Sequence, residues 1–91
     1  MQVISSKDNE LIKHIKKLKD KKYRDENNEY IIEGVKLVEE AVSERAKIKH
    51  IIICENTTNT YEIPTNITLE MARYSCIYVP EKIFNSITQV T

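Results

Sequence analysis

Residues 30–54 have the sequence YIIEGVKLVEEAVSERAKIKHIIIC, and this stretch determines the topology because a helical pattern lies between two apolar runs. The first run, Tyr30-Ile31-Ile32, is typical of a short strand and ends at Glu33-Gly34. The run from Lys47 to Cys54 begins with alternation and closes as a continuous apolar stretch, as expected for a strand covered on both faces. Between them, apolar residues recur at helical spacing at Val35, Leu37, Val38, Ala41 and Val42. The stretch therefore predicts two parallel strands joined by a helical crossover.

Further apolar patterns extend this unit toward both ends of the chain. After it, Cys76 to Val79 is a third buried strand, preceded by a short helix over Leu69 to Tyr74. Pro80 suits the first turn of a last helix. Before the unit, the polar residues Ser5 to Asn9 offer N-caps to an amphipathic helix with an apolar stripe made of Leu11, Ile12, Ile15 and Leu18.

Two polar stretches are predicted to be surface loops. Residues 20–28 have no apolar period, and residues 55–66 are rich in Asn and Thr and closed by a proline. Together the elements predict an α/β fold, a small three-layer α/β/α sandwich with a mainly parallel sheet and helices on both faces. The 91 residues are expected to make one small domain, 1–91, with a single core.

Charge is distributed unevenly along a chain whose net charge is +0. Residues 1–24 carry eight Lys and Arg side chains against three Asp and Glu, so residues 25–91 hold the balancing acidic surplus. A neutral chain has no global attraction for a polyanion, but a basic segment at one end makes a local patch that can contact phosphates. Nucleic acid is therefore the first partner that the sequence indicates.

Composition argues against several other classes of site. One glycine is too few for a dinucleotide-binding or Walker A loop, so no nucleotide cofactor is implied. Cys54 and Cys76 lie in apolar runs and are predicted to be buried, reduced thiols. His14 and His50 have no Cys, His or acidic partner at ligand spacing, so no metal site is expected. No serine or cysteine lies in an activating context, and no catalytic residue is predicted.

Location follows from the same composition. No apolar run approaches the roughly 18 residues that span a bilayer, and the first residues do not resemble a signal peptide. We expect a cytoplasmic chain without a membrane partner.

The basic segment supplies candidate RNA contacts of several kinds. Tyr23 lies between Lys22 and Arg24 and offers a stacking face, and Asn9 can hydrogen-bond base edges or 2′-hydroxyls. Arg24 is expected in an exposed loop, where its loss weakens RNA binding without changing stability. The lysines expected to face phosphates are Lys7, Lys13, Lys17, Lys21 and Lys22. Single-stranded or looped RNA fits this combination better than duplex DNA. The alternative is a solvated lysine face, which is common on helices.

Glu33 and Gly34 are candidates of a different kind. The simplest role of Gly34 is to supply a positive φ or a close backbone approach where a strand turns into its helix. Open α/β sheets also bind ligands at such places, because the carboxyl ends of strands and the N-termini of helices converge there. We therefore include both residues in the expected RNA-binding set.

Two motifs carry a resemblance to a known family. The first is Ile4-Ser5-Ser6-x-x-Asn9-x-x-Ile12-Lys13-x-Ile15-x-x-Leu18-x-x-Lys21-x-x-Arg24, and the second is Tyr30-Ile31-Ile32-Glu33-Gly34-x-Lys36-Leu37-Val38-Glu39-Glu40-Ala41. Taken together, they resemble the N-terminal substrate-binding domain of the SpoU (TrmH) family of RNA ribose 2′-O-methyltransferases. Residues 78–88 are similar to the family's last helix, whereas residues 55–66 depart from its pattern.

The resemblance implies a fold similar to RNA-binding ribosomal proteins and a structured RNA, rRNA or tRNA, as the partner. It also implies that a knotted catalytic domain, which binds S-adenosylmethionine and forms a homodimer, would follow Thr91. This chain alone would then hold no cofactor and be monomeric. The expected function is RNA recognition for an S-adenosylmethionine-dependent 2′-O-methyltransferase. Two alternatives remain open: a free-standing RNA-binding protein of ribosomal type, and a protein-interaction module that uses its apolar strand edges.

Overall fold

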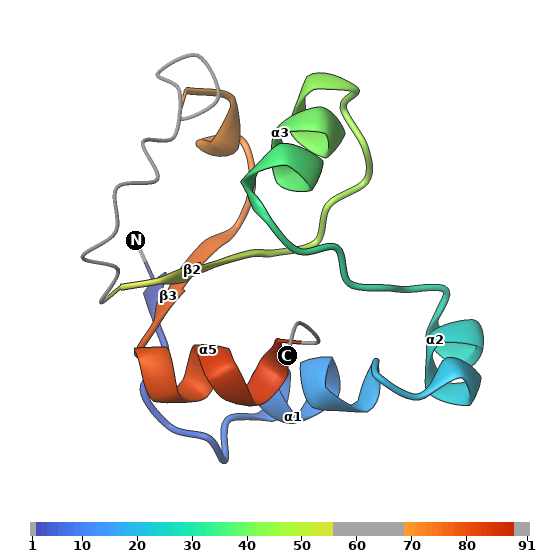
Figure 1. Ribbon diagram of the computed structural model, residues 1–91, viewed down its shortest axis with the longest axis vertical. Helices are drawn as coiled ribbons and strands as arrows, with labels where there is room; N and C mark the ends of the chain where they lie inside the picture. Colours follow the sequence, from blue (N-terminus) through green and yellow to red (C-terminus); the bar gives the residue numbers. More distant parts are fainter. Residues whose placement is uncertain (1, 56–68, 89–91) are drawn as a thin grey trace.

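The computed structural model describes residues 2–55 and 69–88, which form three layers with a small sheet in the middle (Figure 1). Residues 69–71 are helical, and the remaining elements in chain order are β1 (Gln2–Val3), α1 (Glu10–Lys17), α2 (Lys21–Asn27), α3 (Val35–Ser43), β2 (Ile51–Cys54), β3 (Cys76–Val79) and α5 (Glu81–Ile87). The α/β class and the three-layer arrangement predicted from the sequence are confirmed.

The sheet has the strand order β1-β3-β2, and both pairs of neighbouring strands are parallel. Ile51 pairs with Cys76 and Cys54 with Val79 along β2 and β3, while Gln2 of β1 lies opposite Ile77. The predicted parallel sheet is therefore present, with β3 at its centre.

Each face of the sheet carries its own apolar cluster. α1 and α5 cover one face (Figure 1), over the first cluster, which consists of Ile4, Ile12, Ile15, Ile77, Val79, Ile83 and Ile87. α3 and residues 69–71 cover the other face, over the second cluster, which consists of Val42, Ile51 and Met71. Along β2, Ile52 packs against the first cluster, while Ile51 and Ile53 pack in the second, which explains why this strand is apolar throughout. The core is thus divided by the sheet instead of being single.

One strand prediction was wrong. Residues 30–32 form no strand, although their apolar run resembles one. Ile31 packs against the first apolar cluster, but Tyr30 is 77% exposed, so the run reflects partial burial and no strand pairing. The third strand is β1, whose two residues are too few to produce a period in the sequence.

The predicted loop at residues 20–28 was also wrong, because most of it is the helix α2. The Asp20 side chain caps its start by accepting from the Lys22 N–H at 2.9 Å, and Asn28 ends it in the left-handed conformation at φ 54°. α2 has no buried residue. A helix that buries nothing has no apolar stripe, so the sequence pattern could not indicate it.

The remaining helices follow the predictions closely. Asn9 is the N-cap of α1, and its side chain accepts from Leu11 N–H at 2.8 Å. Pro80 is the N-cap residue of α5 and not part of its first turn. The helix expected over Leu69 to Tyr74 covers only 69–71 before a turn. Of the predicted loop at 55–66, all but Glu55 lies outside the described residues.

Cys54 and Cys76 carry reduced thiols and are half-buried, less buried than predicted. The Cys76 thiol donates to the Met71 carbonyl at 3.3 Å, and burial raises the pKa of this thiol. None of the described helices is long and apolar enough to cross a membrane.

Candidate nucleic-acid interface

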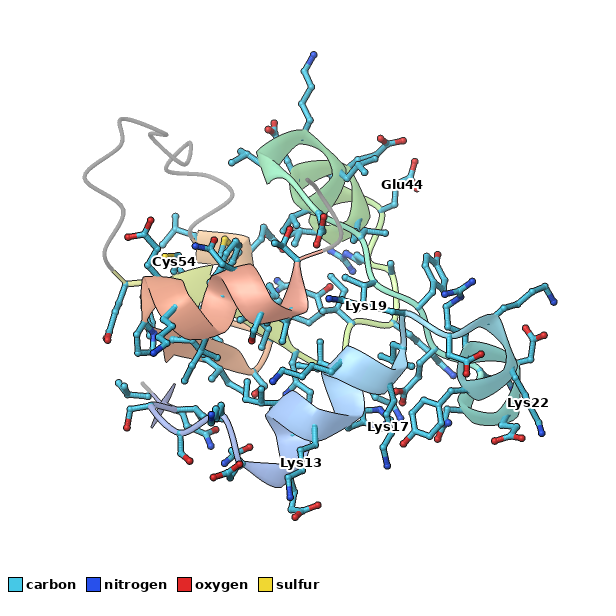
Figure 2. All side chains as sticks on the ribbon, turned by 60° about the horizontal axis from the view of Figure 1, so that its bottom comes forward. Lys13, Lys17, Lys19, Lys22, Glu44 and Cys54 are labelled. Atoms are coloured by element: carbon cyan, nitrogen blue, oxygen red, sulfur yellow. The ribbon has the colours of Figure 1, made fainter. Side chains whose placement is uncertain are left out.

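The helix α1 separates its apolar and basic side chains onto opposite faces. Ile12 and Ile15 are buried against the sheet, while Lys13 and Lys17 are exposed. Figure 2 shows Lys13 and Lys17 projecting from α1, and Lys22 from α2, away from the body of the domain. These three lysines therefore lie on the outer, solvent-facing sides of the two helices.

The lysines differ in how strongly they are engaged. Lys21 pairs with Asp25 at 2.8 Å, and Lys13 lies 3.6 Å from Glu10, both on exposed helix surface where such pairs contribute little. Lys7 and Lys22 are exposed and make no ion pair with any described residue. Phosphates can therefore approach these side chains at little cost in broken contacts.

Arg24 occupies a different setting from the exposed loop predicted for it. It is half-buried, and its Nη1 donates to the carbonyl of Leu18 at 2.9 Å and to that of Lys19 at 2.8 Å. Carbonyls at the end of a helix have no partner within the helix, so a guanidinium can satisfy two of them at once. Arg24 thus fastens the corner between α1 and α2, and this geometry predicts a loss of stability on its removal in place of the unchanged stability expected for an exposed loop.

Tyr23 is likewise engaged inside the domain. Its hydroxyl lies 2.9 Å from Nδ1 of His14, the two rings meet edge to face at 5.4 Å, and the Lys17 ammonium lies 5.6 Å from the Tyr23 ring centroid. The ring is half-buried. Tyr23 therefore positions α2 against α1 and offers less free stacking surface than the sequence indicated.

The contact chain continues from His14 to a residue that the sequence did not single out. Nε2 of His14 lies 2.6 Å from Glu29 Oε1, and the other carboxylate oxygen of Glu29 pairs with Lys49. Because a carboxylate only accepts hydrogen bonds, the Nε2 of His14 carries the proton of this contact. In the neutral ring, Nδ1 then accepts from the Tyr23 hydroxyl. Glu29 thus connects α1, α2 and the segment before β2. These segments are separate in the sequence and are brought together by the fold.

Lys49 and His14, which both contact its carboxylate, lower the pKa of Glu29 below its ordinary value. A carboxylate with a lowered pKa contributes stability above its unfolded-state pKa of about 4.3 and loses that contribution as the pH falls through the lowered value. The network is therefore expected to stabilise the α1–α2 surface at neutral pH and to weaken in acid.

Replacing Glu29 by glutamine is expected to lower the free energy of unfolding at neutral pH by up to about 1 kcal/mol, the range of a partly exposed ion pair. The difference from the parent should shrink as the pH falls below about 4, because protonation removes the same charge from the parent. Urea unfolding across this range measures it, with Glu26→Gln on the exposed surface of α2 as the matched control. A difference that stays constant with pH would contradict the role of the Glu29 charge.

Glu33 and Gly34 lie apart from the lysine surface. Gly34 is the N-cap of α3 and has φ 100°, so the predicted positive φ is confirmed. The start of α3 lies across the sheet from α1 (Figure 1), and the segment before it is not a strand. Gly34 therefore does not follow the strand end that the sequence predicted, and the RNA contacts of Glu33 and Gly34 stay predictions.

The described surface has shallow hollows that do not fit S-adenosylmethionine. Such a cofactor needs an enclosed, largely apolar wall for its adenine. One hollow has an entirely charged lining of Lys21, Lys22, Asp25 and Glu26, and another is lined by Gln2, Ala72, Tyr74, Ser75 and Cys76. We derive no step of methyl transfer from these residues. Within residues 2–55 and 69–88, no three His, Cys, Asp or Glu side chains are placed to hold a metal ion.

Comparison with known proteins identifies the family. The family profile of the MRM3-like substrate binding domain matches residues 9–91, which include every predicted site residue except Lys7. The chain belongs to this family. The MRM3-like substrate binding domain is of the SpoU type of rRNA 2′-O-methyltransferases, so the resemblance stated from the motifs is confirmed.

A protein similar in sequence to this chain points to the same family. The chain is 33% identical over 89 residues to the 23S rRNA (guanosine(2553)-2′-O)-methyltransferase RlmP of Bacillus subtilis (strain 168). The match covers 98% of this chain and 33% of that protein, so the chain spans about a third of the relative's length. No solved structure matches the chain.

Proposed function

We propose that this chain binds and positions structured ribosomal RNA for an S-adenosylmethionine-dependent ribose 2′-O-methyltransferase. The observation that carries the proposal is the family match over residues 9–91, on a domain whose α1–α2 surface presents exposed lysines. The relative named for 23S rRNA favours rRNA over tRNA as the substrate. A free-standing ribosomal-type protein is not favoured, because both comparisons point to methyltransferases.

The predicted site residues then have separable roles. Lys7, Lys13, Lys17, Lys21 and Lys22 contact phosphates, because each side chain is exposed. Asn9 has only its amide NH₂ left for RNA, since Oδ1 caps α1. Tyr23 and Arg24 hold the two helices at the angle that presents these lysines, whatever RNA contact they add. Glu33 and Gly34 would contact RNA only if it extends to the start of α3.

The activity of the whole methyltransferase belongs to the same proposal. A further domain would hold S-adenosylmethionine and form a homodimer, while the domain described in Figure 1 binds RNA as a monomer. The methyl donor supplies the transferred carbon, and this chain supplies recognition alone. The cytoplasmic location expected from the sequence stays a prediction.

The salt dependence of RNA binding tests the lysine surface. If about four phosphates are neutralised, log affinity for a fluorescein-labelled RNA hairpin with an unpaired loop should fall with log salt at a slope of about −3. The double variant Lys13→Gln/Lys22→Gln removes two contacts and should move the slope to about −1.4. Fluorescence anisotropy over a salt series measures both values.

The matched control is Lys36→Gln/Lys82→Gln, which removes two exposed lysines from α3 and α5. It changes the net charge equally but should leave the slope near that of the parent. If both double variants shift the slope alike, the α1–α2 surface has no special part in binding. A hairpin of the same sequence in DNA should bind more weakly.

A further inference from the structure

Among the aromatic residues in the ranges 2–55 and 69–88, Tyr30 is the most open to solvent. Its exposed fraction is 77%, whereas the other aromatic residues within the described ranges, Tyr23, Tyr74, Tyr78 and Phe84, are half-buried. A ring exposed to this extent contributes little to the core. Its surroundings therefore decide whether it has another role.

The backbone that carries Tyr30 is anchored on both sides. Before it, the Glu29 carboxylate contacts His14 and Lys49, and the Glu29 N–H donates to the Arg24 carbonyl at 3.2 Å. After it, Ile31 packs against the first apolar cluster. Neighbours that are both held inward fix the backbone at Tyr30 and leave its ring facing outward. An anchored backbone reduces the conformational entropy that this segment loses when the ring binds a ligand.

Two lysines near this ring come from the segment before β2, outside the basic stretch at residues 1–24. Lys49 contacts the residue next to Tyr30 and is 73% exposed, and Lys47 is exposed two positions earlier. The Glu29 network connects Lys49 with α1 and α2, so the basic surface extends beyond residues 1–24. An exposed ring beside lysines is the combination by which proteins bind single-stranded nucleic acid.

We propose that Tyr30, and not Tyr23, is the base-stacking residue of the RNA surface, with Lys47 and Lys49 contacting the flanking phosphates. This inference rests on the proposed function. Tyr23 is less suited because Lys17 lies over its ring and His14 meets its edge. The stacked base must be unpaired, since a base within a duplex has both faces covered by its neighbours. The substrate class is therefore RNA with a single-stranded loop or bulge.

The chain contains no tryptophan, which allows a direct test of stacking. In Tyr30→Trp, the introduced indole is the sole one in the protein, and a base stacked on it should quench its fluorescence. Leu37→Trp is the matched control, because Leu37 is 50% exposed and belongs to α3, which covers the face of the sheet opposite α1 (Figure 1). The looped RNA hairpin should quench the first variant strongly and the second little.

Affinity measurements give the second readout. Tyr30→Ala should weaken binding of the looped hairpin about 5- to 150-fold, the range for the loss of one stacked base, while Tyr30→Phe should bind like the parent. On a hairpin whose loop nucleotides are abasic, Tyr30→Ala and the parent should bind equally. Urea unfolding of each variant confirms that the exposed substitution leaves the fold intact.

The outcomes separate this inference from the proposed function. If the parent binds the hairpin but Tyr30→Ala binds equally well and Tyr30→Trp is not quenched, Tyr30 does not stack and the lysine surface stands. If Tyr30→Phe binds the looped hairpin like the parent, while Tyr30→Ala weakens binding of that hairpin and not of its abasic form, the inference is supported. If the parent binds neither hairpin nor any looped RNA, both the proposed function and the inference fail.

Discussion

Replacing Gly34 by valine is expected to lower the free energy of unfolding by about 1–3 kcal/mol, the usual cost of holding a side chain in a backbone region reserved for glycine. Gly34 has φ 100° and ψ 149° at the N-cap of α3. A non-glycine residue can adopt these angles only with strain, and a β-branched residue is the least suited. A domain of this size has little stability to lose, so a clear fall in melting temperature should follow.

Backbone strain and steric contact with neighbouring atoms, the two possible origins of this destabilisation, can be distinguished experimentally. A Cβ built on Gly34 meets no atom within 4 Å, so steric crowding by neighbours adds nothing. Gly34→Ala should therefore show most of the loss seen with valine. The matched control is Asn28→Gly at φ 54°, where glycine is accommodated easily and stability should change by less than about 0.5 kcal/mol. Wild-type stability in Gly34→Ala would refute the backbone explanation.

The sequence predicted those elements that bury one face or both. α1 was predicted from its apolar stripe, and β2 and β3 from apolar runs that the two clusters later explained. α2 could not be predicted in this way because it buries no residue and is held by its caps and by Arg24. Residues 30–32 were wrongly predicted to be a strand because they are apolar. Ile31 packs against the first apolar cluster, but the segment does not pair with the sheet.

In the candidate site, too, the sequence predicted the features that follow a helical pattern and missed those created by tertiary contacts. Exposed lysines on α1 could be predicted, because a helical wheel places them opposite the apolar stripe. The contacts of Glu29 with His14 and Lys49 could not, since they join residues from three separate segments. The roles of the aromatic residues changed for this reason: Tyr23, flanked by basic residues in the sequence, packs on His14, while Tyr30, assigned to a strand, faces solvent.

Replacing Arg24 by alanine is expected to destabilise the domain by about 1–3 kcal/mol and to weaken RNA binding as a consequence. The substitution removes two hydrogen bonds from a charged donor to the carbonyls of Leu18 and Lys19, each of the kind that is worth about 1.5–3 kcal/mol when buried. Partial exposure of Arg24 lets water replace part of that energy, which sets the lower limit. The corner between α1 and α2 should loosen, and the exposed lysines of α2 would lose their set position relative to those of α1.

Arg24→Lys separates the two roles that this residue can have. If Arg24 serves only as a positive charge for phosphate, lysine should restore both affinity and stability, because the charge is retained. If it serves as the fastening of the corner, lysine should restore neither fully, since the planar guanidinium fixes the directions of the two N–H groups of Nη1, whereas an ammonium on a flexible stem does not. Arg73→Ala is the matched control, because this arginine is exposed and its contact with Glu70 at 3.5 Å is a surface ion pair. Thermal melts and anisotropy on the three variants should rank Arg24→Ala below Arg24→Lys, with Arg73→Ala close to the parent in both measurements. Were Arg24→Ala to melt like the parent while losing affinity, the arginine would be an RNA contact and the two carbonyl bonds would contribute nothing to stability.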